Sequence, residues 1–301
     1  MTPTTETGLL HNDELKDAWP VLSHGERVEA FRLLPFVDGD DFFLSLSARE
    51  QAELLPALGR AERRSRIRLL APDDAADLLQ SVKDGPGREE LLALLDEGTR
   101  REVTALLAYA EDDAGGLMSP RYARVRPEMG VDEAISYLRK QARERVETIH
   151  YAYALDAEQR LVGVVSFRDL FQANPGRAVR DVMQTELITV PEEMDQEAVS
   201  RLFSEHNLLA IPVVDAERRM KGIVTVDDIV DVVQEEATED IQKVGGMEAL
   251  DAPYFDISFP RMIRKRGVWL VVLFLGEMLT ATAMSFFESE LDRAVVLALF
   301  V

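Results

Sequence analysis

An internal repeat constrains the fold of this chain more than any other feature of its sequence. Residues 151–170 read YAYALDAEQRLVGVVSFRDL and residues 210–229 read AIPVVDAERRMKGIVTVDDI, with Asp, Gly and a second Asp at matching positions. Each copy has the pattern of a short strand, a turn that begins at an Asp, a second apolar strand and a helix. We therefore predict two tandem α/β modules, over residues 114–178 and 179–240.

The repeat extends upstream of these two stretches. The segment GGLMSP at 115–120 corresponds to RDVMQ at 180–184, and a helical pattern follows each of them, at 131–143 and 195–206. Both predicted modules therefore have the same order of elements.

Both copies contain the motif Ser/Thr-x-x-Asp, present as Ser166 with Asp169 and as Thr225 with Asp228. With this motif the repeat resembles a tandem pair of CBS domains, which pack into a pseudo-symmetric unit. The resemblance implies an adenine nucleotide ligand, because a hydroxyl and a carboxylate at a strand-to-helix turn can hold ribose hydroxyls while backbone N–H groups meet phosphate. The sequence leaves open the alternative that these residues only cap the following helix.

The first copy is the better candidate for a nucleotide site. Arg168 supplies a positive charge and Tyr151 an aromatic face, whereas the second copy has Asp227 at the position of the arginine. We predict that ATP, where it binds, contacts Tyr151, Ser166, Arg168 and Asp169.

The N-terminal region, residues 1–113, has a different pattern. Between residues 26 and 110 Leu, Ala, Glu and Arg recur at spacings of three and four, with breaks at prolines and glycines, so we predict short helices stacked into a superhelix. In the segment PDDAADLL, Asp73 and Asp77 lie one helical turn apart after Pro72. These two residues either form an acidic surface that meets another part of the protein, or only complement the positive end of the helix dipole, as acidic residues often do.

Charge and cysteine content exclude several functions. The net charge of −21 argues against nucleic acid as a partner, since phosphate binding needs a cationic surface. The absence of cysteine excludes disulfides and thiolate metal sites, and the four histidines are scattered. An enzyme is the least expected class, because no nucleophile-base set and no phosphate-binding Gly-x-x-x-x-Gly-Lys loop is found.

The most informative stretch for function is acidic. Residues 227–240, DDIVDVVQEEATED, contain seven carboxylates and neither Lys nor Arg. On a helix one face would pack and the other would collect like charges, whose repulsion a bound cation could relieve. Oxygen ligands suit Mg²⁺ or Ca²⁺, and the spacing does not fit a calcium-binding EF-hand loop. The alternative is an ordinary solvated surface helix.

Near the C-terminus an apolar run, 268–287, follows a cluster of basic residues, Arg261, Arg264, Lys265 and Arg266. Its length and this basic flank predict a transmembrane helix at 267–287 with residues 1–266 in the cytoplasm; a buried helix of a soluble core is the alternative. We expect 241–266 to form a connecting juxtamembrane helix. A second apolar run at 294–301 reads as the start of another membrane helix, so we expect a fragment that stops before a pore is complete.

The order of these segments resembles the MgtE family of magnesium channels over nearly the whole chain. The resemblance is carried by AEDDAGGLMSP, the two CBS-like repeats, EEATEDI and RKRGVWLVVLFLGEMLTA, in this sequence order. It implies α plus α/β domains in a homodimeric, Mg²⁺-selective channel of the cell membrane. Mg²⁺ on cytosolic acidic surfaces would keep the pore closed, and low intracellular Mg²⁺ would release it.

The resemblance also implies regulatory metal ligands at seven positions: Asp73, Asp77, Asp228, Asp231, Glu236, Glu239 and Asp240. One departure from the family pattern is Asn207, where an acidic residue is frequent, so a metal site there would be weaker. Two rival functions are a nucleotide-sensing CBS protein that acts on a separate membrane partner and an anchored scaffold. The resemblance to the magnesium-channel family, by contrast, implies that this fragment senses Mg²⁺ and attaches to the lipid bilayer through its C-terminal helices.

Overall fold

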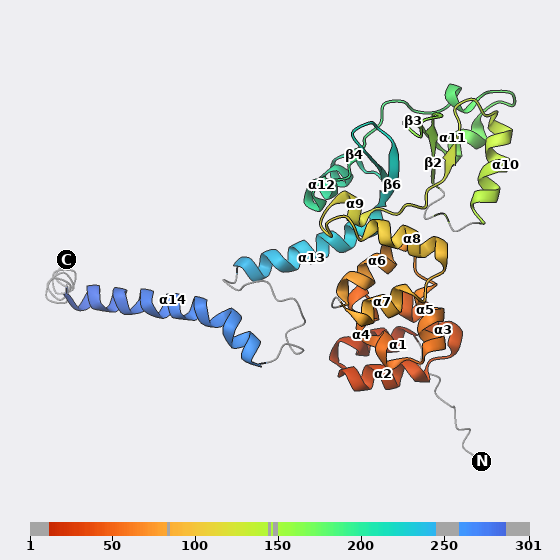
Figure 1. Ribbon diagram of the computed structural model, residues 1–301. Coiled ribbons are helices and arrows are strands. Elements are labelled where there is room, and N and C mark those ends of the chain that lie inside the picture. The colour runs from red at the N-terminus through yellow and green to blue at the C-terminus, as the bar shows by residue number, and fades with distance from the viewer. Residues whose placement is uncertain (1–11, 83–84, 144–145, 147–149, 245–258, 287–301) are drawn as a thin grey trace, which may run out of the picture. The chain divides into compact units, whose positions relative to one another are not determined.

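The structure, a computed structural model, shows a helical N-terminal region followed by two α/β modules and two long helices (Figure 1). It describes residues 12–82, 85–143, 146, 150–244 and 259–286. The chain divides into two compact units, residues 1–230 and 231–301. The predicted helical region and the predicted α/β pair are thereby confirmed as fold classes.

The N-terminal region consists of short helices, as its proline and glycine breaks predict. Their bounds are α1 Asn12–Ala18, η1 Trp19–Val21, α2 His24–Leu33, α3 Phe36–Leu44, α4 Ala48–Leu54, η2 Leu55–Ala57, α5 Arg60–Ile67, α6 Pro72–Ser81, α7 Pro86–Leu92 and α8 Glu97–Leu106. Local capping residues set their starts. Ser47 and Glu50 form a capping box at α4, Asp96 accepts two backbone N–H bonds at α8, and Pro72 and Pro86 occupy first-turn positions.

The core of this region is aromatic at its N-terminal end. Phe42 is fully buried and packs in an edge-to-face arrangement with Trp19, with 4.8 Å between the ring centroids. The buried Arg66 forms an ion pair with Asp40 and lies over the ring of Phe36, 4.9 Å from its centroid. These contacts satisfy a guanidinium that would otherwise be costly to bury.

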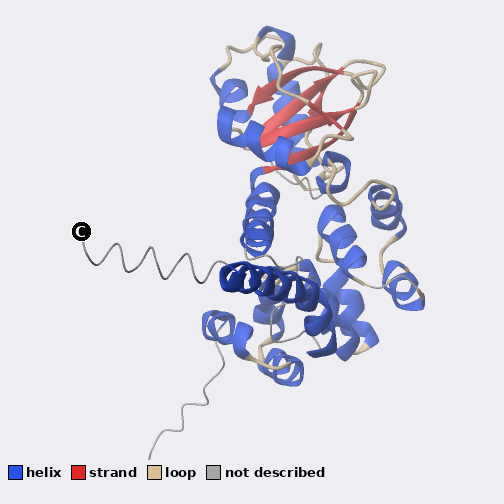
Figure 2. Ribbon diagram, turned by 90° about the vertical axis from the view of Figure 1, so that its left-hand side faces the viewer, coloured by secondary structure: helices blue, strands red, loops and turns tan. Residues whose placement is uncertain are grey.

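The modules repeat one set of elements. The first comprises α9 Ala114–Leu117, β1 Arg124–Val125, α10 Val131–Gln141, β2 Tyr151–Leu155, β3 Leu161–Ser166 and α11 Phe167–Gln172. The second comprises η3 Val179–Asp181, β4 Val190–Pro191, α12 Gln196–His206, β5 Ala210–Val214, β6 Met220–Thr225 and α13 Val226–Val244. Figure 2 shows that the strands are confined to these modules.

The two sheets have the same topology. In each, a short first strand runs parallel to the second and the second pairs antiparallel with the third, in the orders β1-β2-β3 and β4-β5-β6. Their register shifts at equivalent positions, between Ala154 and Leu155 and between Val213 and Val214. The two copies of the repeat therefore share the same strand pairing, including the position of this register shift.

The predicted Asp-initiated turns are also equivalent, and they pair with each other. Asp156 Oδ1 accepts a hydrogen bond from the backbone N–H of Arg160 at 2.8 Å, and Asp215 Oδ1 accepts the same bond from Arg219 at 2.8 Å. Leu161 N–H donates to the carbonyl of Arg218 at 3.0 Å, which ties one turn to the other. The pseudo-symmetry axis therefore passes near these turns.

The segments that precede the two sheets, 115–120 and 180–184, are called lead segments below. Each of them pairs with the sheet of the other module. Ser119, which precedes the first module's sheet, exchanges backbone hydrogen bonds with Ile223 of β6 at 2.7 and 2.9 Å. Gln184, which precedes the second module's sheet, exchanges them with Val164 of β3 at 2.8 and 2.9 Å. A glycine is needed beside each crossing: a Cβ on Gly222 would lie 2.7 Å from the carbonyl oxygen of Ser119.

The buried apolar residues show which module the N-terminal region packs against. One continuous cluster contains Leu78 and Val103 from that region together with Val199 and Ile229 of the second module. The first module has a separate core around Leu138 and Val165. Helix α6 is thus held close to the start of α13, and this proximity brings together acidic residues far apart in sequence.

The C-terminal unit contains α14, Phe259–Phe286, so a helix forms where an apolar run predicted one. Within the described residues, no helix combines the length and apolar character that crossing a membrane requires. The predicted membrane span at 267–287 is therefore not confirmed. The predicted connecting helix falls mostly, and the run at 294–301 entirely, outside the described residues.

Candidate functional site

The first candidate site is the turn between β3 and α11, where a nucleotide was predicted. Tyr151 and Ser166 are directly opposite each other on β2 and β3, so the sheet brings them together. Ser166 Oγ donates to Asp169 Oδ2 at 2.7 Å and accepts from the Asp169 backbone N–H at 3.0 Å. Arg168 is exposed. The hydroxyl therefore caps α11, and a ribose would have to share the oxygens of this pair.

The equivalent turn in the second module is more buried. Thr225, buried at 4% exposure, donates from Oγ1 to Asp228 Oδ2 at 2.5 Å. The Thr225 backbone N–H donates to the same oxygen at 3.2 Å. The second module thus fixes its carboxylate by two hydrogen bonds, and the pair belongs to the first turn of the acidic helix.

Asp228 is electrostatically unusual. Burial raises the pKa of this carboxyl to about 7; the charges of Asp227 and Asp74 raise it further, and the hydrogen bonds from Thr225 oppose the shift. Asp74 lies in the first turn of α6, so its effect shows that the N-terminal region and the second module present carboxylates to each other. Two acidic groups that repel across a domain contact are suitable ligands for a divalent cation.

The sequence singled out Asp73 and Asp77 on α6, whose role as metal ligands stays a prediction, and the structure adds Asp74. Asp73 is buried at 5% exposure and Asp77 is half-buried, whereas the exposed Asp74 repels Asp228. On a helix Asp74 points about 100° away from Asp73. Only the position of the second module decides which of these faces matters, so no local signal could have made the choice.

The remaining predicted metal ligands lie further along α13. Asp231 is exposed and Glu236 is half-buried, while the side chains of Glu239 and Asp240 lie outside the described residues. Among the side chains that the structure describes, no group of three or more His, Cys, Asp or Glu residues is placed to hold a metal ion. The seven-residue ligand set stays a prediction, and the structure brings only part of it near another acidic group.

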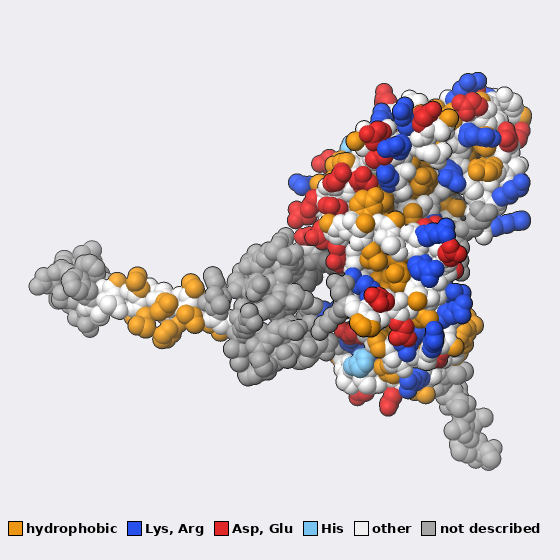
Figure 3. Space-filling model, viewed as in Figure 1, with side chains coloured by type: hydrophobic (Ala, Val, Ile, Leu, Met, Phe, Trp, Pro, Cys, Tyr) orange, Lys and Arg blue, Asp and Glu red, His pale blue; other side chains and the backbone are white. Residues whose placement is uncertain are grey.

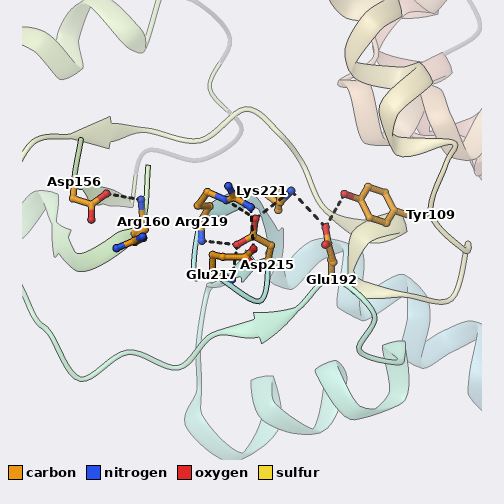
Figure 4. A network of polar contacts seen from close by, with 8 residues as sticks. All are labelled: Tyr109, Asp156, Arg160, Glu192, Asp215, Glu217, Arg219 and Lys221. Carbon is orange, nitrogen blue, oxygen red and sulfur yellow. Dashed lines mark hydrogen bonds and ion pairs between the residues drawn. The ribbon is translucent and has the colours of Figure 1, made fainter. Parts of the chain in front are cut away.

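A polar network joins the end of the N-terminal region to the second module (Figure 4). Tyr109 donates to Glu192 at 2.8 Å, and Lys221 lies 4.0 Å from Glu192 and 3.5 Å from Asp215. Arg219 donates to Asp215 Oδ2 at 2.8 Å. Burial and the hydrogen bond to Glu192 raise the pKa of Tyr109 to about 12, so its proton stays on the phenol at neutral pH.

The surface charge is segregated. Figure 3 shows Asp and Glu side chains gathered over the second module, and Lys and Arg side chains along the edge formed by the N-terminal helices and the first module. An acidic chain with net charge −21 therefore still presents a basic edge.

Comparisons with known proteins agree with this architecture. The model of the MgtE intracellular N domain matches residues 10–112, and that of the CBS domain matches 114–176 and 179–235. The magnesium transporter MgtE of Thermus thermophilus is 41% identical over 294 residues, which are 97% of this chain and 65% of the relative. The magnesium transporter MgtE of Bacillus subtilis is 34% identical over 263 residues, 87% of this chain and 57% of the relative.

A solved structure is similar over most of its length. The cytosolic domain of the Mg²⁺ channel MgtE in complex with ATP is 42% identical, with a TM-score of 0.68, and the match covers 74% of this chain and 90% of that domain. The chain spans less than two thirds of the two curated transporters, 65% and 57% of their lengths.

Proposed function

Because this chain belongs to the MgtE family of magnesium transporters, we propose that it is the Mg²⁺-sensing and gating region of a magnesium channel. The observation that carries the proposal is the surroundings of Asp228: burial raises the pKa of this carboxyl most, and the charges of Asp227 and of Asp74 on the N-terminal region raise it further. Asp74 and Asp228 come from different domains, and a carboxyl with a pKa near 7 is one whose charge its surroundings do not neutralise. A divalent cation is the partner that would remove this penalty.

We propose that the contact between the N-terminal region and the second module has a closed state and a looser state. When the contact between the N-terminal region and the second module tightens, Asp74 and Asp228 approach and repel. Bound Mg²⁺ would neutralise these carboxylates. Since only the closed arrangement collects them, Mg²⁺ would bind it more tightly and shift the population towards it. Several weak sites can supply the roughly 5.5 kcal/mol that a nearly complete switch requires.

ATP is the second proposed ligand, at Tyr151, Ser166, Arg168 and Asp169. The support is the cross-strand pairing of Tyr151 with Ser166 and the exposed arginine beside them. The similar cytosolic domain was solved in complex with ATP. ATP would adjust the sensor and would not be hydrolysed, and the named relatives are transporters and a channel.

The wider setting of the sensor is also proposed. We place it in a homodimeric transporter of the cell membrane, with 1–113, 114–178 and 179–240 as its domains. The relatives' names as magnesium transporters support this setting. Attachment to the bilayer through residues 267–287 stays a prediction from the sequence.

Limited proteolysis of the chain tests the Mg²⁺ proposal. Millimolar Mg²⁺ should slow cleavage between the N-terminal region and the second module, while KCl of equal ionic strength should not. Asp74→Asn and Asp228→Asn should each weaken the response, and Asp132→Asn, an exposed acidic residue on α10, should leave it unchanged. Identical cleavage with and without Mg²⁺ would refute the sensor.

A further inference from the structure

A cleft lies between the N-terminal region and the first module, away from the acidic contact with the second. Its volume is about 770 Å³. The residues that matter for its chemistry are Arg68, Asp96, Thr99 and Glu102 on one wall and Arg121, Tyr122, Arg124, Gln141 and Arg143 on the other. Clefts of this size hold nucleotide-sized ligands.

The lining of this arginine cleft has an excess of positive charge. It contains four arginines against two carboxylates, in a chain whose net charge is −21. Both carboxylates already have partners. Asp96 accepts from the Thr99 backbone N–H at 3.1 Å, and Glu102 pairs with Arg121 at 2.7 Å. The two carboxylates offset at most two of the four arginines, so the lining keeps a net positive charge.

Two of the arginines are available to a ligand. Arg124 and Arg143 are exposed, and no contact between described residues gives either side chain a carboxylate partner. Arg124 is held on a rigid element: the Gln141 amide donates to its carbonyl at 2.7 Å and accepts from its N–H at 3.1 Å. These bonds fix the backbone of Arg124 at the edge of the cleft, while its exposed guanidinium stays accessible to an anion.

The cleft adjoins the aromatic residues of the first module. Tyr122 packs edge-on against Tyr153, with 5.8 Å between ring centroids, and Tyr151 packs on the same buried cluster. The arginine cleft thus begins beside a residue of the proposed nucleotide site. An aromatic base near Tyr151 and an anionic group beside Arg124 would belong to one elongated ligand.

We infer that the arginine cleft binds the phosphate groups of a nucleoside polyphosphate, so that the N-terminal region and the first module hold one ligand between them. Planar guanidinium groups bind phosphate oxygens in pairs, and several of them favour a polyphosphate over a single carboxylate. Arg68 supplies the contribution of the N-terminal region. The inference rests on the proposed regulatory function and adds that nucleotide restrains the sensing domain directly.

Binding of ATP and of inorganic tripolyphosphate, measured by titration calorimetry on the whole chain, tests the inference. The variant Arg124→Gln/Arg143→Gln should weaken ATP binding at least about tenfold, the loss expected for one charged hydrogen bond. The matched control is Arg139→Gln/Arg177→Gln, which removes two exposed arginines that do not line the cleft. It should bind ATP within about twofold of the unaltered chain, by the same conversion.

Each outcome decides a part of the inference. Equal losses in the cleft variant and the control would overturn it, because net charge alone would then explain the effect. Equal affinity of the unaltered chain for ATP and tripolyphosphate would overturn the nucleoside requirement. Arg68 Nε also donates to the Leu94 carbonyl at 2.8 Å. An Arg68→Gln variant that keeps the melting temperature of the unaltered chain separates a shared ligand from one held by the first module alone, because only a shared ligand then loses affinity. Protection by Mg²⁺ without nucleotide is a separate readout, so failure here leaves the sensor proposal standing.

Discussion

At the scale of single residues, Asp228 combines three conflicting demands. It closes the first turn of a helix through Thr225, it is partly buried, and it faces a second acidic domain. A residue that only capped a helix would be an exposed carboxylate with a lowered pKa, as Asp96 is. The raised pKa of Asp228 therefore indicates that its ionised carboxylate makes the folded protein less stable than an ordinary helix cap would.

Replacing this carboxylate should stabilise the protein in the absence of metal. In Mg²⁺-free buffer at pH 8, Asp228→Asn should raise the free energy of unfolding by about 1–2 kcal/mol, since an amide keeps an acceptor for Thr225 and loses the charge. The pKa of Asp228 in the folded chain lies above its ordinary value of 3.8, so the destabilisation grows as pH rises from there to about 7. Chemical denaturation at pH 5 and 8 measures this, with Asp132→Asn as control. A destabilised variant at pH 8 would contradict it.

Asp215 should show the opposite pH dependence. Burial raises its pKa, but the hydrogen bonds and charge of Arg219 outweigh burial and lower the pKa to about 2. Because the folded pKa is below the unfolded one, this carboxylate contributes stability at pH values above about 4 and loses it as pH falls to about 2.

Acid unfolding of Asp215→Asn tests this sign. The variant should be less stable than the unaltered chain at pH 7, and the difference should shrink between pH 4 and 2. Asp156→Asn at the equivalent turn is a matched comparison, because Asp156 makes the same backbone bonds and, among the described residues, forms no ion pair. A difference that stays constant with pH would show that Arg219 does not depress the pKa.

At the scale of elements, the repeat predicted the modules well because each copy carries its own strand, turn and helix signals. The helices at 131–143 and 195–206 appear as α10 and α12 within a few residues. The exchange of the lead segments between the two sheets was not predictable. The segments around Met118 and Met183 have similar sequences, and neither contains a local signal for the sheet that it joins. The same limit applies to Asp74, whose role depends on which module packs against α6.

The crossings predict an unusual cost for a small substitution. Gly222→Ala should destabilise the protein by about 1–3 kcal/mol, because the new methyl group would meet the carbonyl of Ser119 at 2.7 Å and the lead segment would have to move. Gly25→Ala in α2 is the control: no heavy atom lies within 4 Å, and alanine favours a helix. Thermal unfolding of both variants measures the difference. Equal melting temperatures would rule out a tight crossing.

At the scale of the whole molecule, the N-terminal region is attached to the second module by a shared core and by the Tyr109–Glu192 hydrogen bond. It meets the first module across the arginine cleft, where Arg121 pairs with Glu102. The N-terminal region thus meets carboxylates of the second module and arginines of the first. Metal and nucleotide would act on opposite contacts of the same domain.

Removing the hydroxyl of Tyr109 should loosen the contact with the second module. Tyr109→Phe should cost about 1 kcal/mol and speed proteolysis near residues 107–113 in Mg²⁺-free buffer, because Glu192 loses a donor. The half-buried ring is unchanged, so the modules themselves should melt as before. Tyr137→Phe, at an exposed tyrosine on α10, provides the comparison. Unchanged cleavage kinetics would show that the shared core alone holds the contact.

The crossed lead segments also set an order for folding during synthesis. Gln184 pairs with the edge of β3, so the first sheet cannot be completed until the ribosome has synthesised that residue. Ser119, in contrast, has already been synthesised when its partner strand β6 emerges. A nascent chain that stops after α11 carries an open strand edge, the kind of surface that invites aggregation. The two halves of the repeat are therefore one folding unit, and gene fragments cut between them should yield insoluble protein.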